Sequence, residues 1–354
     1  MVAGPFSSPF RVIDKPYVIW SHDPAAENMD FLGSIDSDFY ERTVQTFFCD
    51  DDGNLRFDSE NNEARRDVSS FARLVWNHGL ETLVTLLGAY VQAPHAVHGF
   101  FLKCENKDCR KIASYLLSGQ IPESNFLVRS EFDFLAFVRG IHARSPWIND
   151  EPTMRNFACA LSEMLSEYDR DDLRAEYNSI KHGLRARHGR FAIALGLQES
   201  IGIPAPKENM TMLSDSRDGS HFLALQAFQN LSKKDTREQF SVRQRSLGWS
   251  LVRTLLDIQL FTCLIGNIVG ALKIAAGATP ETVQFFRPDV GEDWWQEYFN
   301  ERVPSVQNSS FGLVVDIPKV PEDAEKQVTK FYRDQTKAKR IAKEADGLIE
   351  VDPI

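Results

Sequence analysis

Apolar residues recur at every third or fourth position along much of the chain, which is the spacing of an amphipathic helix. The clearest case begins at Ala64, in "ARRDVSSFARLVWNHGLETLVTLLGAYVQAP", and ends before Pro94, because proline cannot continue a helix. The same spacing predicts shorter helices over 108–117 and from Pro152 to Tyr168, and proline is favoured in a first helical turn. The pattern therefore predicts a mainly α fold, built as a helical bundle with a small inserted β-hairpin or sheet.

The β part of this prediction rests on segments in which apolar and polar residues alternate, as in a strand with one buried face. These segments are "RFAIALGLQ" (190–198), "HFLALQAF" (221–228) and "FGLVVDI" (311–317). The first sixty residues read as irregular structure with short strands, at 17–20 and twice within "TFFCDDDGNLRFD" (46–58).

Helices are predicted to resume near residue 236 and to run through the apolar segment 251–276 and the aromatic segment "EDWWQEYFNERV". The charged segment 321–347 has a weak apolar stripe, which favours a peripheral or partner-facing helix. The expected regions are an irregular N-terminal part (1–63), a helical bundle (64–190), a β insertion (191–235) and a C-terminal helical layer with a charged tail helix (236–354).

The composition narrows the classes of function. A net charge of −10 over 354 residues, with a pI near 5.4, argues against a protein that coats nucleic acid or a polybasic membrane binder. Any nucleic-acid site has to be a local basic patch. The five cysteines are too few and too scattered for a disulfide framework, and residues 1–15 lack the pattern of a signal peptide. Gln259, Asn267 and Lys273 interrupt the most apolar segment, which favours a buried core helix over a membrane span. We therefore expect a cytoplasmic protein that does not bind membranes.

The segment "EYNSIKHGLRARHGR" (176–190) is unusually basic for such an acidic chain. At about 100° per residue, a helical wheel separates three faces. The apolar face holds Leu173, Tyr177, Ile180 and Leu184, the polar face Arg174, Asn178, Lys181, His182 and Arg185, and the small-residue face Ala175, Ser179 and Gly183. A line of small residues lets a neighbouring helix approach, so we expect this helix to be sandwiched and its basic face to be semi-enclosed. Asp169 is the expected N-cap.

A semi-enclosed group of arginine, lysine, histidine and asparagine is suited to a phosphate or a carboxylate. We assign His182, Arg174 and Asn178 as candidate catalytic residues, and Lys181, Arg185 and Arg187 as candidate phosphate ligands. The alternative stays open that these side chains pair with acids of the same chain and only stabilise the fold.

The phrase "EYNSIKHG", after a helix that reads "WNHGLETLVTLLGAYVQAP", resembles bacterial helical proteins similar to the HEPN superfamily. The resemblance implies a helical bundle, often dimeric, and for active members RNA cleavage without a metal. The active signature is an arginine, four to six residues and a histidine, usually with a polar residue directly after the arginine. Arg174 and His182 are too far apart for this signature, and Arg73 and His78 have the spacing but Leu74 follows the arginine. A binding or scaffold version of such a bundle therefore stays open.

A second polar face is expected on the helix that begins at Ala64, where Arg73, Asn77 and Glu81 follow at intervals of four and His78 lies beside them. Arg73, His78 and Glu81 are a secondary candidate site, which either opposes the first face across a cleft or is a solvated helix edge. Zinc is a further alternative, since two histidines and two cysteines lie within fifteen residues, but no C-x-x-C pair supports it. These ligands would be His95, His98, Cys104 and Cys109.

The sequence as a whole predicts a protein directed at RNA or nucleotide phosphate, without a cofactor, for which the resemblance implies HEPN-like ribonuclease activity. No nucleophile elbow, glycine-rich phosphate loop or H-E-x-x-H motif is present. The alternative is a non-enzymatic interaction or scaffold protein with a structural polar helix face. The expected partners are RNA or a nucleotide, a protein that binds the C-terminal helix, and a second copy of the chain.

Overall fold

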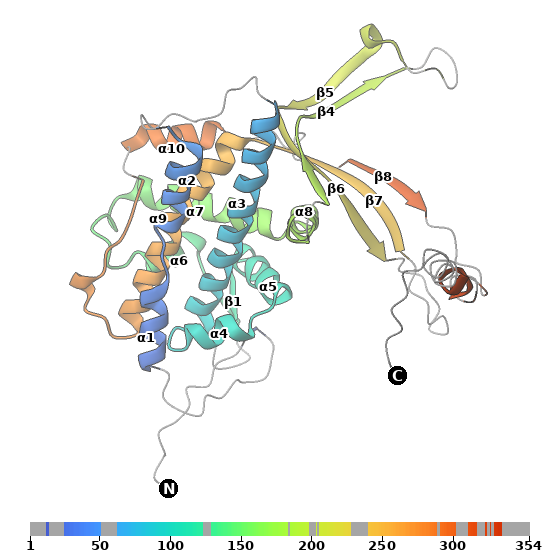
Figure 1. Ribbon diagram of the computed structural model, residues 1–354. Coiled ribbons are helices and arrows are strands. Elements are labelled where there is room, and N and C mark those ends of the chain that lie inside the picture. Colours follow the sequence, from blue (N-terminus) through green and yellow to red (C-terminus); the bar gives the residue numbers. More distant parts are fainter. Residues whose placement is uncertain are drawn as a thin grey trace, which may run out of the picture. The chain divides into compact units, whose positions relative to one another are not determined.

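The computed structural model describes residues 12–13, 25–50, 62–122, 129–182, 185–197, 203, 205–227, 240–288, 291–301, 311–316, 323, 326 and 329–334. Within these residues the fold is mainly α with small sheets, as predicted (Figure 1). The helices are α1 (Ala25–Ser34), α2 (Phe39–Phe48), α3 (Asn62–Gln92), α4 (Val97–Lys103), α5 (Asn106–Leu117), α6 (Phe134–Ile141), α7 (Glu151–Tyr168), α8 (Asp171–Lys181), α9 (Leu251–Ala275) and α10 (Gly291–Asn300).

The chain divides into two compact units. The first contains residues 1–224 and 244–313 and holds all of these helices, and the second contains residues 225–243 and 314–354. In the second unit, residues 329–334 are helical and Phe331 and Tyr332 are exposed, in agreement with a peripheral C-terminal helix.

The long helices α3 and α9 pack against each other at the centre of the first unit (Figure 1). Ser250 caps α9 by accepting a hydrogen bond from the Arg253 amide, and Gly277 ends it with a φ of 101°, which favours glycine. By length and composition α9 is the helix among the described residues that could cross a membrane, yet 89% of its most apolar stretch is buried within the protein. The predicted core helix is confirmed.

Local signals explain where most of the other helices begin. Asp150 caps α7 through the Thr153 amide, with Pro152 in the first turn, and Glu105 and Asp108 form a reciprocal capping box at α5. The predicted role of Asp169 is wrong, because α7 runs as far as Tyr168 and Asp169 lies at its C-terminal end. The next helix begins at Asp171.

The prediction of irregular structure and strands before residue 63 is wrong for residues 25–34 and 39–48, which form α1 and α2. The buried residues of α2 follow the spacing of a helix and include a threonine; they are Tyr40, Thr43, Val44 and Phe48. This helix packs against α9. The predicted strand at 17–20 and residues 51–58 lie outside the described residues.

The strands form three small sheets. They are β1 (Gln120–Pro122), β2 (Arg129–Glu131), β3 (Ala186–His188), β4 (Phe191–Gly196), β5 (Met210–Ser216), β6 (Asp218–Ala227), β7 (Phe240–Trp249) and β8 (Phe311–Asp316). β1 pairs with β2, β4 with β5, and a four-stranded sheet has the order β3-β6-β7-β8. The strands predicted at 190–198, 221–228 and 311–317 are present as β4, β6 and β8. The hairpin expected between the first two is wrong, because β4 pairs with β5, which lies in the segment expected as their loop, and β6 joins the four-stranded sheet. The helix expected from residue 236 is wrong for 240–249, where β7 lies beside β6 and buries Leu247 and Trp249.

One buried hydrophobic cluster joins helices from both ends of the first unit. It includes Trp76 and Leu83 of α3, Phe157 of α7, Phe261 of α9 and Tyr298 of α10. This core fixes α3, α7 and α9 as a framework on which α8 and the sheet containing β3 and β6 are held.

Candidate functional site

The helix that carries the basic segment, α8, is held by a buried ion pair with α3. Arg73 donates from Nε to Glu176 Oε1 at 3.2 Å and from its terminal nitrogen to Oε2 at 2.5 Å. The two side chains are 4% and 0% exposed, so the pair has almost no contact with solvent. Glu176 was not recognised in the sequence as a functional residue, although it is the one acid in an otherwise basic segment.

Further groups complete this pair. Ser220 of β6 donates to Glu176 Oε1, and Trp249 of β7 donates from Nε1 to Ser220 Oγ at 2.9 Å. The Arg73 guanidinium lies 4.2 Å from the Trp76 ring centroid and 5.0 Å from that of Trp249. The donors of Arg73 face Glu176 and the faces of its guanidinium meet aromatic rings. The interactions of Arg73 are therefore made within the protein.

Trp76 also belongs to a second buried network. Asp257 of α9 accepts hydrogen bonds from Trp76 Nε1 at 2.9 Å, Tyr298 Oη at 2.9 Å and Arg253 Nε at 3.1 Å. Arg253 also donates to Glu163 of α7 at 3.1 Å. Burial raises the pKa of Tyr298, and the neighbouring Asp257 carboxylate raises it further. The charges of Asp257, Arg253 and Glu163 are therefore paired and well supplied with hydrogen bonds.

Glu167 of α7 lies between these two networks, and its carboxyl group has no hydrogen bond to the described residues. It lines two small cavities of about 30 Å³ each, which also share Trp76 and Leu173. Burial, and next the Asp257 carboxylate, raise the pKa of Glu167 to about 7, while Arg73 and the other nearby arginines oppose the rise. Each cavity is large enough for one water molecule and too small for a substrate.

The predicted basic face of α8 lies in solvent. Its five residues, Arg174, Asn178, Lys181, His182 and Arg185, are all exposed, and the buried positions of the helix are Leu173, Glu176 and Ser179. The expected semi-enclosed environment is therefore wrong. The neighbour of Ser179 is a strand, since its Oγ lies 3.3 Å from Leu223 O of β6. The same hydroxyl donates to Ala175 O of its own helix at 2.8 Å. Gly183 and Leu184, which complete two of the predicted faces, lie outside the described residues.

Two cations of this face pair with acids. Arg174 lies 2.9 Å from Asp171, and Lys181 lies 3.4 Å from Glu81 of α3 and 4.1 Å from the centroid of the Tyr177 ring. Arg185 donates to the carbonyl of Asn178 at 3.3 Å.

At the C-terminal end of α8 and in β3, three exposed basic groups have no carboxylate partner among the described residues. They are His182, Arg185 and Arg187 of β3, whose Cα is paired in register with that of His221 of β6.

The secondary candidate residues are divided between the interior and the surface. Arg73 is buried, whereas His78 is exposed and its Nδ1 lies 3.1 Å from the hydroxyl of Tyr40 in α2. Partial burial lowers the pKa of His78, with Glu81 raising it and Lys181 lowering it. Burial also raises the pKa of Tyr40 to about 12.

The two predicted polar faces meet at Glu81. It accepts from the Tyr177 hydroxyl at 3.0 Å as well as from Lys181, so α3 and α8 share this carboxylate. Tyr40 was not a candidate in the sequence, because α2 was not recognised as a helix.

The cysteines of the zinc alternative come together, with Cys104 Sγ and Cys109 Sγ 3.4 Å apart and Cys109 also 3.4 Å from Thr85 Oγ1. Hydrogen bonding to Cys104 lowers the pKa of the Cys109 thiol. No group of three or more histidine, cysteine, aspartate or glutamate side chains placed to hold a metal occurs in the described part of the chain, so His95 and His98 do not complete such a group there.

Comparison of the chain with protein-family models, curated proteins and solved structures finds no match. The residues of α3, α8 and β3 and their surroundings are therefore what indicates a function.

Proposed function

We propose that this protein binds the phosphate groups of RNA or of a nucleotide at the C-terminal end of α8. The residues that bind are Lys181, His182, Arg185 and Arg187, which we call the α8–β3 basic surface. One observation carries the proposal: in a chain of net charge −10, three of these four side chains are exposed without a carboxylate partner among the described residues. Arginines in this state retain their fork of donors for a phosphate, and they attract an anion from solution.

The resemblance to HEPN-like proteins extends the proposal to metal-independent RNA cleavage. In this version His182 moves a proton and Lys181 and Arg185 hold the phosphate beside it. Arg174 lies two helical turns, about 12 Å, from His182 along the axis of α8, so it contacts a different phosphate of the same strand. Asn178 lies between them on the exposed face and offers its carboxamide to the ribose.

A non-enzymatic role is the second candidate. It is favoured by the pairing of Arg174 with Asp171, of Lys181 with Glu81, and of Arg185 with the Asn178 carbonyl. Cations near the C-terminus of a helix satisfy its last carbonyls and its dipole, so Lys181 and Arg185 also stabilise α8. In that case the surface serves the fold or an acidic protein partner.

The test is the affinity for a fluorescein-labelled single-stranded RNA, measured by anisotropy between about 50 and 200 mM salt. Arg187→Ala and Arg185→Ala/Arg187→Ala are expected to weaken binding at unchanged melting temperature. The slope of log K against log salt should fall by about 0.7 for each phosphate that the variant no longer binds. Arg155→Ala is the matched control, since Arg155 is an exposed arginine of α7 that pairs with Glu151.

Cleavage is measured separately on the same RNA. His182→Ala is expected to lower the rate of cleavage by a factor of about 10²–10⁴ and to leave most of the affinity, which Lys181, Arg185 and Arg187 still supply. A parent protein without affinity for RNA or nucleotides, or arginine variants that only lose stability, would favour the second candidate.

A further inference from the structure

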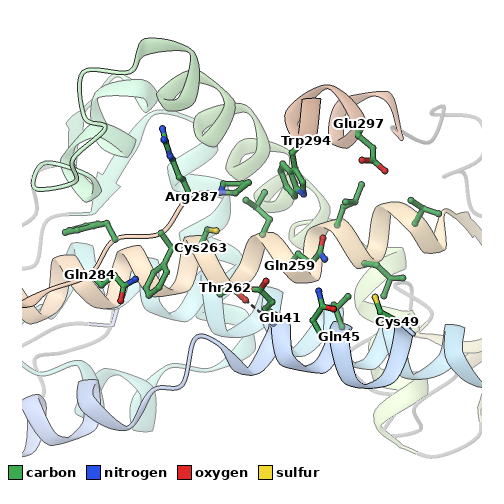
Figure 2. Close-up of a pocket in the computed structure, with 18 of the residues that line it drawn as sticks. Glu41, Gln45, Cys49, Gln259, Thr262, Cys263, Gln284, Arg287, Trp294 and Glu297 are labelled. Atoms are coloured by element: carbon green, nitrogen blue, oxygen red, sulfur yellow. Dashed lines mark hydrogen bonds between the residues drawn. The ribbon is translucent and has the colours of Figure 1, made fainter. Parts of the chain in front are cut away.

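A groove of about 650 Å³ runs along one side of α9, well separated in sequence from the α8–β3 basic surface. Its floor is apolar and includes Leu255, Leu256 and Leu260 of α9. Figure 2 shows α2 on one side of α9, and the segment 284–288 and α10 on the other. All of these elements belong to the first unit of the chain. The three leucines are at most 8% exposed, so the apolar surface that a ligand can reach comes mainly from the half-buried side chains of Val252, Phe286 and Trp294.

Three carboxamides from three different elements line this groove. They belong to Gln45 of α2, Gln259 of α9 and Gln284, and none of them forms a hydrogen bond with the described residues. Figure 2 shows all three around the α9 floor. A carboxamide presents a donor and an acceptor side by side, which matches the N–H and C=O groups of an extended peptide. Their distribution over both walls and the floor is therefore suited to a ligand that presents amide groups along its length.

The uncompensated charge of the groove is negative. Glu41 of α2 and Glu297 of α10 are exposed on opposite walls, and neither pairs with a cation among the described residues. The cation that lines the groove, Arg287, is 3.6 Å from Asp150 and so is paired already. Trp294 adds an aromatic ring beside Glu297, which favours the head of a lysine or arginine. These groups repel a phosphate and attract a basic side chain.

We propose that this groove binds an extended peptide segment of a partner protein that carries apolar side chains and at least one lysine or arginine. The apolar side chains pack on Val252, Phe286 and Trp294, the three glutamines bond to the peptide backbone, and the basic side chain lies between Glu41 and Glu297. This binding site is independent of the α8–β3 basic surface, and it requires neither RNA binding nor cleavage.

The test uses the full-length protein and a phage-displayed library of random dodecapeptides. Selected peptides are expected to combine apolar residues with lysine or arginine. Their affinity, measured by anisotropy on the synthetic peptide, should fall by about fivefold in Glu41→Gln/Glu297→Gln, which corresponds to the upper range of an exposed ion pair. Gln259→Ala should also weaken binding, and the melting temperature should not change, because these side chains have no polar partners among the described residues.

Two controls separate this site from unspecific attraction. Glu208→Gln removes an exposed acid of the segment Lys207–Asn209, outside the groove, and is expected to leave the affinity unchanged. Glu297→Lys is expected to favour a version of the peptide in which glutamate replaces the basic residue. A selection that enriches no basic and apolar peptides, or peptides whose affinity is the same in the parent and in all groove variants, overturns the proposal.

Discussion

The buried pair of Arg73 and Glu176 gives the sharpest test of how α8 is held. Arg73→Met leaves Glu176 without its cation, and Glu176→Gln leaves Arg73 without its anion, each at a site with at most 4% exposure. Breaking such a pair costs about 3–5 kcal/mol, which is a large part of the roughly 5–15 kcal/mol that stabilises a folded protein. We expect the free energy of unfolding of both single variants to fall by this amount in urea unfolding. Tryptophan fluorescence is a suitable readout, because the Arg73 guanidinium lies over the rings of Trp76 and Trp249.

The two single variants differ in their response to pH. A carboxyl group left alone can take up a proton and become neutral, whereas a guanidinium cannot lose one. The loss of stability in Arg73→Met should therefore shrink on acidification, and the loss in Glu176→Gln should persist. Arg73→Met/Glu176→Met removes both charges and should recover most of the stability, less about 1–3 kcal/mol for the hydroxyl of Ser220 that loses its acceptor.

The exposed Arg155, which pairs with Glu151 at 2.9 Å, provides the control, and Arg155→Met should change stability by less than about 1 kcal/mol. Unfolding of Arg73→Met at the same urea concentration as the parent would show that the pair does not hold α8. If this stable variant has also lost RNA cleavage, Arg73 acts on a substrate and not on Glu176.

Three further variants test the interior. The raised pKa of Glu167 means that the folded protein binds the proton of this carboxyl group more tightly than the unfolded chain does. The free energy of unfolding should therefore fall by up to about 3 kcal/mol as pH rises from about 4.5 to 7. Glu167→Gln should abolish that part of the pH profile. Burial lowers the pKa of His188 to about 4, so stability should instead fall as pH drops from about 6.5 to 4, and His188→Gln should reduce this fall in the same unfolding assay. A Cβ at Gly79 would lie 2.3 Å from the Phe261 ring, so Gly79→Ala should lower the melting temperature by overpacking, at a cost of about 1–3 kcal/mol, whereas Gly33→Ala has open space and should not.

The long helices could be predicted because their signals are local. Apolar spacing, Pro152 and the Pro94 boundary lie within each segment, and they place α3 and α7 within a few residues. In α2, by contrast, Thr43 fills one of the buried positions and the aromatic run at its end resembles a strand, so the helix depends on packing against α9, more than two hundred residues away. β7 was missed for a similar reason. Its arginines and glutamine weaken the alternation of apolar and polar residues, so the strand depends on its pairing with β6.

The polar residues of α8 were grouped correctly by the helical wheel, but their environment was not predictable. A wheel gives the relative directions of side chains on one helix and does not say which direction is buried. Glu176 and Arg73 are 103 residues apart, so their pairing is invisible in either segment alone. The Glu81–Lys181 contact, 100 residues apart, was expected only as an alternative in which two polar faces oppose each other.

The buried pair also determines the charge of the α8–β3 basic surface. Glu176 is the acid within 176–190, and its charge is neutralised by Arg73 inside the protein. If α8 were free to turn about its axis, Glu176 would reach solvent and offset one of the exposed arginines.

Arg73→Met is therefore expected to weaken RNA binding although Arg73 does not reach the surface, because it releases the orientation of α8. Arg73→Met/Glu176→Met should restore affinity together with stability, since an apolar pair holds the same face inward and removes the acid. An arginine that binds phosphate directly cannot be rescued in this way, since methionine has no donor for a phosphate. Affinity for labelled RNA in the two variants, compared at equal fraction folded, decides between a positioning role for Arg73 and direct binding.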